Sequence, residues 1–331
     1  MSKKLLLVNK LNEDEIFHFI VKNYKILSRK WINHQWNWME LSFSFFKDHT
    51  KSLVLEVILK EILKSYSQNK IFYQFDEFFN NSNLIIDAFT IRKISENLDS
   101  PKETIRRKLI ELEKKEQISI KNKQIITKKS LLQKSITDQK IKLLINYLEY
   151  FSNLLYEKKL IPRNFNSNEI EKTIKNNFSH IWPWYCEMQI SMMTSWKKHF
   201  GDFVSFHIWS TCLINQLHHV NKKDFMNSGD IDRETLHKFM ITENLGHGVN
   251  GFSLSQILNI PRATVIRKCK EMIEGKKLKY NDRKQFILHG TNVAKFNSVQ
   301  EKILRTKAKF LSKLLNFQLV NINDKFLIIM N

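Results

Sequence analysis

One segment of this chain occurs twice, and that repetition limits the fold more than any other feature. The segment from Ser100 to Ile126 reappears from Ile260 to Phe286 at a constant offset and without gaps. The matching pairs are Pro101 with Pro261, Thr104 with Thr264, Arg107 with Arg267, Lys108 with Lys268 and Glu111 with Glu271. Self-similarity on this scale is the mark of a copied supersecondary unit, so we read the chain as internally duplicated.

Each copy predicts a helix followed by a small β-hairpin. Ser100 is expected to cap the first helix, with Pro101 at the first helical position and Glu103 completing a capping box. An apolar stripe at helical spacing predicts the buried face of each helix. Its members are Ile105, Leu109 and Leu112 in the first copy, and Val265, Cys269 and Met272 in the second.

The flanks of the two copies also agree. A shorter apolar segment precedes each helix, FTIRKISENL in one copy and FSLSQILNI in the other, and predicts another helix ending in a turn. Two β-prone runs follow each helix, QISI with QIIT and KLKY with QFIL, and the polar turns between them predict hairpins.

The order helix, turn, capped basic helix and hairpin resembles the winged helix-turn-helix of bacterial transcription regulators. The pattern Pro, basic, any, Thr, β-branched, any, Arg, Lys is similar to the start of their recognition helix, and it stands at Pro101 and again at Pro261. The resemblance covers about residues 84–128 and 248–290. It implies that the second helix of each module enters the major groove of DNA and that the hairpin is a wing.

The chain contains only seven Gly and four Pro, so a mainly α fold is expected. We predict a first repeat at 1–160 with a trailing helix at about 137–158, and a second at 161–331 with a trailing helix at about 297–317. Residues 160–168 connect the repeats, and residues 70–88 link the first helical region to its winged helix. By layout alone this is similar to MarR-type regulators, which implies a monomer acting as a pseudo-dimer; further dimerisation stays open.

The net charge of +21 points to a polyanion partner, but the distribution of arginine is the better argument. Lysine outnumbers arginine by 44 to 10, and much of that lysine fits a solvated surface. Arginine is preferred for bidentate recognition of guanine and phosphate. Four of the ten arginines, Arg106, Arg107, Arg262 and Arg267, lie in the two repeated helices.

These observations predict a double-stranded DNA interface on both helices. In the first copy Lys102, Glu103 and Arg106 are expected to face the bases, with Thr104 and Arg107 nearer the phosphates. In the second the same places hold Arg262, Ala263, Ile266, Thr264 and Arg267, with Lys268 on the same basic face. The wing tips add Lys121, Lys123, Arg283 and Lys284. The plain alternative for these residues is a solvated helix face.

The two helices differ where bases are read. Arg106 is replaced by Ile266 and Glu103 by Ala263. An arginine can fork onto guanine, whereas an isoleucine makes only apolar contact, for example with a thymine methyl group. The helices are therefore expected to read different half-sites of an asymmetric operator. Ile260 stands where Ser100 does and cannot cap, so we expect the second helix to begin less rigidly.

Aromatic residues gather upstream of each module, and the pair Trp36 and Trp38 resembles the pair Trp182 and Trp184. This echo suggests that the duplication extends upstream. The aromatic residues fit three interpretations: an ordinary core, an interface between the halves, or a pocket for a small-molecule effector. We favour the ordinary core.

Other classes of site are poorly supported. Three cysteines lack CxxC spacing, which fits a reducing cytoplasm and predicts neither disulfides nor zinc, and no stretch has membrane-spanning length. Gly246, Gly248 and Gly251 spell GxGxxG but lack a βαβ context, so Gly246 is expected to end a helix and the others to form a mobile loop. The histidines show no HxxxH pair, and no catalytic set or cofactor site is evident.

We therefore expect a cytoplasmic, non-enzymatic regulator that binds specific DNA sequences. Two other classes remain open. Plasmid replication initiators also resemble two winged helices in one chain, and winged helices also serve as scaffolds for protein interaction. The basic recognition faces favour DNA over a protein partner.

Overall fold

The computed structural model of the chain describes residues 10–80, 83–86, 90–121, 124–128, 134–219, 247–289 and 293–329. Within them the fold is mainly helical, with two small antiparallel sheets. The helices are α1 (Glu13–Lys22), α2 (Tyr24–Phe46), α3 (His49–Gln68), α4 (Phe75–Asn80), α5 (Ile91–Leu98), α6 (Lys102–Lys114), α7 (Lys134–Glu157), α8 (Ser167–Asn176), α9 (Phe178–Phe200), α10 (Phe203–His219), α13 (Gly251–Leu258), α14 (Arg262–Glu274) and α15 (Val293–Ile329).

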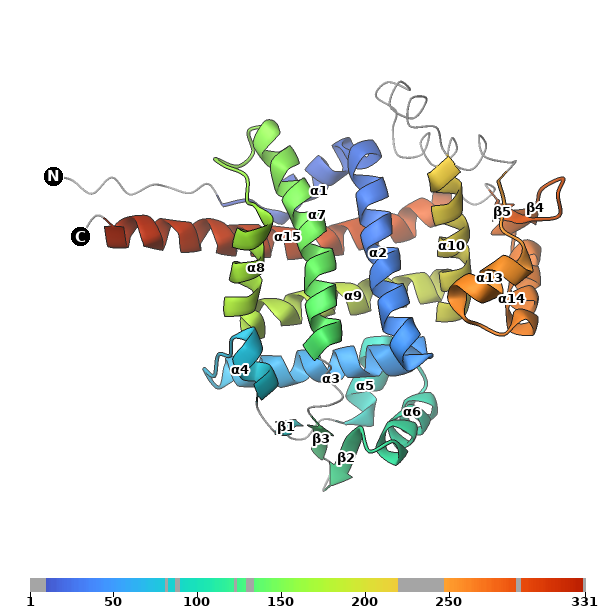
Figure 1. Cartoon of the computed structure of the whole chain (residues 1–331), viewed down its shortest axis with the longest axis horizontal. Helices are drawn as coiled ribbons and strands as arrows, with labels where there is room; N and C mark the ends of the chain where they lie inside the picture. Colours follow the sequence, from blue (N-terminus) through green and yellow to red (C-terminus); the bar gives the residue numbers. More distant parts are fainter. Residues whose placement is uncertain are drawn as a thin grey trace.

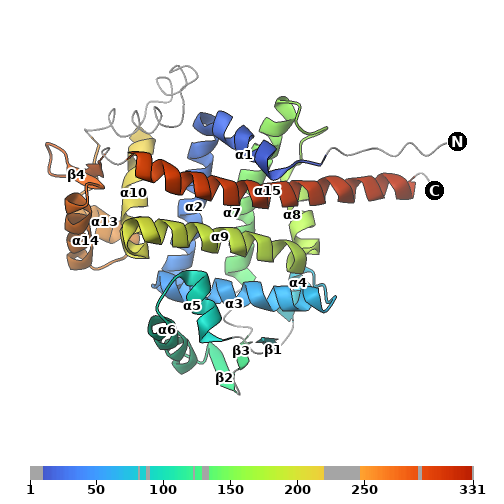
Figure 2. The same cartoon turned by 180° about the vertical axis from the view of Figure 1, so that it is seen from behind.

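The long helices cross one another to form the body of the molecule. In Figures 1 and 2, α15, α9 and α3 run side by side, while α2, α7, α8 and α10 run across them. Contacts of α9 with both α15 and α3, and of α2 with α7, support this arrangement. The small sheets lie outside the body, one below α3 and the other beyond α10 (Figure 1).

The helix bounds of the two halves correspond. α1 and α8 have ten residues each, α2 and α9 have 23 each, and both pairs begin 154 positions apart (167 minus 13, and 178 minus 24). Asn12 and Asn166 form the same capping box, with Glu15 and Glu169 respectively. The Asn and the Glu three positions after it form the same capping hydrogen bonds in both halves, so the same local sequence pattern starts both helices.

The predicted equivalence of the tryptophan pairs is wrong. Trp36 is the thirteenth residue of α2, whereas Trp182 is the fifth residue of α9. The pairs therefore lie at different heights on equivalent helices. Their resemblance in sequence was one of composition, since both helices need large apolar residues to fill the same body.

The two halves interleave in space. α1 packs on α15 and α8 packs on α7, so each half places its first helix on the last helix of the other. Similarly, α3 packs on α9 and α10 packs on α2. The division at 160/161 therefore describes the order of the chain, while the buried apolar residues form one connected cluster among the described residues.

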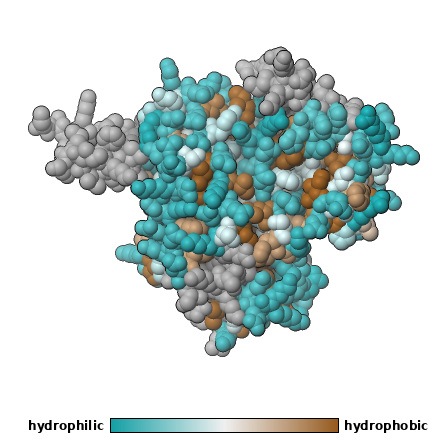
Figure 3. Space-filling view, in the orientation of Figure 1, coloured by the Kyte–Doolittle hydropathy of each residue, from teal (hydrophilic) through white to brown (hydrophobic). Residues whose placement is uncertain are grey.

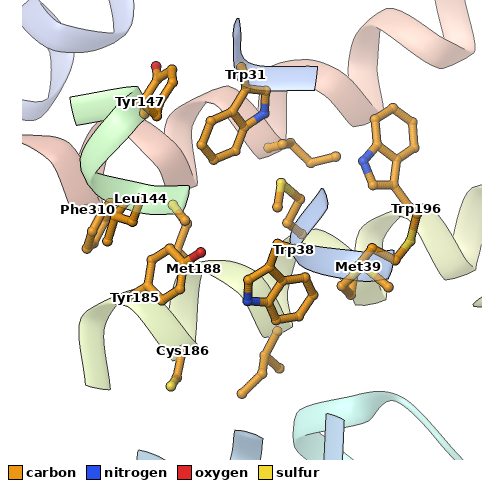
Figure 4. Packing of buried hydrophobic residues seen from close by; sticks show 14 of the residues in the cluster. Trp31, Trp38, Met39, Leu144, Tyr147, Tyr185, Cys186, Met188, Trp196 and Phe310 are labelled. Atoms are coloured by element: carbon orange, nitrogen blue, oxygen red, sulfur yellow. The ribbon is translucent and has the colours of Figure 1, made fainter. Parts of the chain in front are cut away.

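Aromatic and sulfur-containing side chains fill this shared core. Figure 4 shows Trp31, Trp38 and Met39 of α2 among Tyr185, Met188 and Trp196 of α9, with Leu144 and Tyr147 of α7 and Phe310 of α15 beside them. Both Trp38 and Trp182 are almost completely buried. Most of the aromatic residues are thus core, as the favoured interpretation held, and many also join the two halves.

The segment 70–88, expected to be a linker, contains two further elements. It holds α4 and the strand β1 (Asn83–Ile86), which pairs with β3 (Gln124–Lys128), itself paired with β2 (Ile118–Lys121). The order β1-β3-β2 makes a three-stranded antiparallel sheet. The apolar run at β1 is too short to predict a strand alone, because its pairing partner lies far along the chain. The second sheet consists of β4 (Leu278–Tyr280) and β5 (Phe286–Leu288).

The trailing helices are longer than predicted, at 134–157 and 293–329. None of the helices in the described ranges combines the length and the apolar character needed to cross a membrane.

Candidate nucleic-acid interface

Two modules outside the body carry the candidate interface. The first module comprises β1, α5, α6, β2 and β3, and the second comprises α13, α14, β4 and β5. α5 and α13 have eight residues each, α6 and α14 have thirteen each, and both pairs begin 160 positions apart (251 minus 91, and 262 minus 102). α6 packs on α3, and α14 packs on α10.

The turn between the two helices is built alike in both modules. The first helix ends in a left-handed residue, Asp99 with φ 44° in one module and Asn259 with φ 50° in the other. Asp and Asn adopt this conformation more readily than most residues, so each ends its helix at low cost. The hydroxyl of Ser95 donates to the carbonyl of Ser100, and that of Ser255 donates to the carbonyl of Ile260.

The predicted capping box at α6 is wrong. Both α6 and α14 begin after a proline, Pro101 or Pro261, and neither start has a side-chain cap. The Ser100 hydroxyl is buried and donates instead to the Leu98 carbonyl, while Glu103 binds Arg106. We also predicted that α14 would begin less rigidly than α6. This prediction fails for the same reason, because Ser100 does not cap α6 and neither helix has a side-chain cap.

The buried stripes lie where the sequence placed them. Ile105, Leu109 and Leu112 face the interior from α6, and Val265, Cys269 and Met272 do so from α14. This fixes the rotation of each helix about its axis, so the opposite residues face solvent.

An ion-pair cluster holds each second helix against the body. Lys108 Nζ lies 2.7 Å from Asp48, and Lys268 Nζ lies 2.7 Å from Asp202. Asp48 and Asp202 stand just before α3 and α10. Burial alone would raise the pKa of Asp202. Hydrogen bonds from Lys268 and from the Ser205 backbone N–H lower this pKa by more than burial raises it, so the pKa lies below its usual value.

Lys268 was expected to face DNA, but the structure turns it toward the body. Its side chain is 16% exposed, and its ammonium also lies 2.9 Å from Glu271. Burial alone would lower the pKa of this ammonium. Its two carboxylate partners, Asp202 and Glu271, raise this pKa by more than burial lowers it, so the ammonium stays charged. Lys268 thus holds α14 in place, as Lys108 holds α6. The spacing of basic residues could not separate this role from DNA contact, because Asp202 is remote in sequence.

The exposed face of α6 carries most of the predicted residues. Lys102, Glu103, Arg106 and Arg107 are exposed, and Thr104 is half-buried. Arg106 donates two hydrogen bonds to Glu103, at 2.8 and 2.7 Å, which raises the pKa of the guanidinium. Such an exposed pair contributes little stability, so Arg106 is free to exchange this partner for another acceptor.

The exposed face of α14 is more apolar and has a different shape. Arg262, Ala263 and Arg267 are exposed, Thr264 is half-buried, and Arg267 lies 2.5 Å from Glu271. A shallow depression on this face is lined by Arg262, Ala263, Ile266, Arg267, Lys270, Glu271 and Glu274.

Ile266 is half-buried because it lies over the start of α13. A Cβ added to Gly251 would come within 2.3 Å of Ile266 Cδ1, so the isoleucine side chain, as it lies here, occupies the space that glycine leaves. The equivalent residues of the first module are Ile91 and Arg106. The first module thus has a large residue and an exposed arginine where the second has glycine and an isoleucine that leans onto it, which makes the two faces different.

The hairpin tips carry the remaining predicted residues. Lys121 is exposed at the end of β2, whereas Lys123 lies outside the described residues. Arg283 and Lys284 are exposed in the turn between β4 and β5. In that turn the Asn281 side-chain oxygen accepts from the backbone N–H groups of Arg283 and Gln285, so the tip has a defined shape.

Gly248 and Gly251, predicted to form a mobile loop, are part of the packed second module. Gly251 begins α13, and Gly248 packs so closely on β5 that an added Cβ would lie 2.6 Å from Gln285 Cβ. Gly248 also donates its N–H to the Gln285 side chain. Gly246 and the helix end predicted there lie outside the described residues.

One important residue was missed in the sequence. Lys197 of α9 donates to the carbonyls of Leu98 and Asp99 and to the Ser100 hydroxyl. Burial lowers its pKa more than the nearby Asp99 raises it. A residue of the second half thus holds the turn of the first module. No local signal marked Lys197, since its partners are about a hundred positions away.

The two modules present different surfaces. Figure 3 shows a mainly hydrophilic surface at the lower right, where α6 lies, and hydrophobic residues between hydrophilic ones at the right, around α13 and α14. Among the latter, Phe252 and Ile257 of α13 are about half exposed, at 57% and 47%. Their counterparts on α5 are Arg92 and Asn97.

Within the described residues, no cluster of three or more His, Cys, Asp or Glu side chains fits a metal ion. Beside the second module, His219 of α10 stacks on His247, with ring centroids 4.1 Å apart. Comparison of the chain with models of protein families, with curated sequences and with solved structures finds no match.

Proposed function

We propose that this protein is a sequence-specific double-stranded DNA-binding regulator in which each module acts as a winged helix-turn-helix. The observation that carries the proposal is the pair of thirteen-residue helices, α6 and α14, each with its apolar face buried and its arginines exposed. A helix of this width fits the major groove, and exposed arginine binds both guanine and phosphate.

The fixing of each helix supports the same function. The Lys108–Asp48 and Lys268–Asp202 ion pairs attach α6 and α14 to long helices of the body, so the exposed faces have a set orientation. Recognition of bases benefits from this fixed orientation, because ordering a flexible helix on binding costs conformational entropy and so weakens the affinity. The uncapped N-terminal N–H groups of both helices also suit phosphate oxygens.

The modules lie at different corners of one body, α6 below α3 and α14 beyond α10 (Figure 1). One chain therefore offers two unequal reading helices, and we propose a bipartite, asymmetric site. Lys121, Arg283 and Lys284 on the hairpin tips would add contacts to the backbone or the minor groove.

Salt titration of DNA binding tests this function. Arg107→Ala and Arg267→Ala are expected to weaken binding to every duplex and to flatten the dependence of log Kd on log salt, by a slope of about one for each lost phosphate contact. Arg163→Ala, remote from both modules in the α7–α8 turn, is the matched control. Selection from random DNA then identifies the preferred sequence. Binding that is absent at low salt, or unchanged in both variants, contradicts the proposal.

The replication-initiator alternative shares this interface, and the origin or promoter character of the selected sequence distinguishes the two. A protein-interaction scaffold has one observation in its favour, the half-exposed Phe252 and Ile257 on α13.

A further inference from the structure

A cavity of about 110 Å³ lies between the body and the second module. Its walls come from α2, α9, α10 and α15, and from the turn after α14 and the end of β5. Both halves of the chain therefore contribute to it, and so does the module that carries α14.

Aromatic rings make up much of the wall. Trp196, Trp209, Phe200 and Phe296 contact one another, with centroids 5.0 to 5.4 Å apart for the Phe200–Trp209, Trp196–Phe296 and Trp209–Phe296 pairs. Trp31, which lies to the left of Trp196 in Figure 4, also lines it. A cavity of this size and polarity suits one small ring, because an apolar cavity of comparable volume holds benzene.

The polar groups of the wall are cationic or neutral. Lys276 and Lys277 line the cavity where the turn after α14 meets the body, and no aspartate or glutamate is among its described lining residues. Lys277 Nζ donates to the His199 carbonyl, which fixes its ammonium beside the Phe200 ring. Gln35 is buried and its Oε1 has no hydrogen-bond partner within the described chain. The wall thus offers positive charge at one side and an acceptor for a ring hydroxyl or amine.

In the first half, an ion pair occupies the positions equivalent to this part of the cavity wall. Ser210 of α10 and Gln300 of α15 line the cavity, and their counterparts are Glu56 of α3 and Lys140 of α7. Glu56 and Lys140 form a buried ion pair, joined by the Cys186 thiol. Ser210 instead donates to the carbonyl of His207 in its own helix. The cavity thus has shorter neutral side chains at the positions where the first half has two long charged ones.

We propose that this cavity binds a small aromatic carboxylate, one per chain, with its ring among the tryptophans and its carboxylate at Lys276 and Lys277. Because the cavity wall includes residues on either side of β4 and β5, the bound molecule contacts the second module and not the first. It thereby alters the placement of α14 alone, a consequence that rests on the proposed DNA-binding function, whereas binding itself does not.

Titration of the full chain with phenylacetate tests binding through tryptophan fluorescence. Four of the seven tryptophans line the cavity, so a ring entering it changes the emission strongly. A ligand of this size is expected to bind with a Kd of roughly micromolar to millimolar. Phenylacetamide, which lacks the charge, is expected to bind at least about tenfold more weakly, and acetate not to change the emission. Equal binding of phenylacetate and phenylacetamide, or no saturable change, overturns the proposal.

Two variants locate the site. Ser210→Glu with Gln300→Lys installs the ion pair of the first half and is expected to abolish the fluorescence change. Lys276→Ala, an exposed substitution that leaves the core intact, is expected to weaken phenylacetate but not phenylacetamide. Unchanged phenylacetate binding in Lys276→Ala overturns the proposed orientation, even if the double variant does not fold.

A DNA arm separates the two proposals. Phenylacetate is expected to alter protection of the half-site contacted by α14 and to leave the other unchanged. A saturable fluorescence change with phenylacetate but no DNA binding supports the ligand site and contradicts the proposed function. DNA binding without a saturable fluorescence change supports the proposed function and contradicts the ligand site.

Discussion

At the residue scale, Arg106 and Ile266 show how the two modules differ. Arg106 projects into solvent beside Glu103, whereas Ile266 leans onto Gly251. Gly251, which stands where the first module has Ile91, leaves room for the isoleucine, so the two differences between the modules are linked by packing. The thymine-methyl contact that we predict for Ile266 would therefore use only the part of the side chain that faces the depression on α14.

Arg106→Ala is expected to reduce discrimination at one base pair of the preferred site. If Arg106 leaves Glu103 to fork onto guanine, its removal costs roughly tenfold to a hundredfold in preference for the matched base. Competition binding with single-base variants of the selected duplex measures this. Ile266→Ala, at the equivalent position, is the matched control and should affect a different half-site. Equal losses on specific and random DNA for Arg106→Ala would count against direct readout.

We expect His34 to make the stability of the protein depend on pH. It is buried, its Nδ1 lies 3.1 Å from the Leu143 carbonyl and its Nε2 lies 3.2 Å from the Tyr185 hydroxyl. Burial lowers the pKa of His34 to about 4, against an ordinary value of 6.5. The neutral ring is therefore favoured by folding, so this contribution is fully present above pH 6.5 and is lost as the pH falls toward 4.

Denaturant unfolding at pH 7 and pH 4.5 tests this effect. The free energy of unfolding of the wild type is expected to fall by roughly 2.4 kcal/mol more than that of His34→Gln. His49, whose pKa burial also lowers, is present in both proteins and cancels in the comparison. Parallel pH dependences in the two proteins would show that His34 does not carry the effect.

At the scale of elements, the equivalent helices are held by different chemistry. α3 and α7 meet through the buried pair of Glu56 and Lys140, while α10 and α15 meet at a cavity. A buried pair of charges is costly to break, because the surviving charge stays desolvated, but it is often replaceable by apolar residues.

Glu56→Ala is therefore expected to lower the free energy of unfolding by roughly 3–5 kcal/mol, since it leaves the Lys140 ammonium unpaired. Glu56→Met with Lys140→Met should stay close to the wild type, because both charges are removed together. Urea denaturation of the three proteins measures both effects. A double variant as unstable as Glu56→Ala would mean that the pair itself, and not the orphaned charge, is what stabilises the contact.

At the scale of the whole molecule, interleaving turns two similar halves into one body. Lys197 of the second half holds the turn of the first module, and α1 packs on α15 at the other end of the chain. The position of α6 is thus set by helices of both halves, because α6 packs on α3 and the turn before it binds Lys197 of α9, whereas α14 packs on α10 of its own half.

Footprinting tests the single-chain arrangement. One chain is expected to protect two stretches of unequal sequence, and Arg107→Ala and Arg267→Ala should each weaken protection of a different stretch. Analytical ultracentrifugation of the complex measures how many chains are bound. A palindromic site bound by one chain, or a site that requires two chains, would contradict an asymmetric pseudo-dimer.

Local sequence sufficed for the helices, the hairpins and the buried stripes of α6 and α14, because helical periodicity, turn residues and β-propensity act over a few positions. It failed for the start of α6, where the Ser100 hydroxyl binds the Leu98 carbonyl and Lys197. It also failed for Lys268, for β1 and for the register of the tryptophan pairs, since each depends on a partner remote in the chain.

Sequence by itself determined that this chain is mainly helical and that two basic helices of one pattern follow similar turns. Only the tertiary structure decided which basic residues face solvent, that the halves interleave, and that a cavity lies beside the second module and an ion pair in the first half. The physical reason is range: capping, periodicity and turns are local, whereas burial, ion pairing and cavity volume are set by side chains brought together from distant helices.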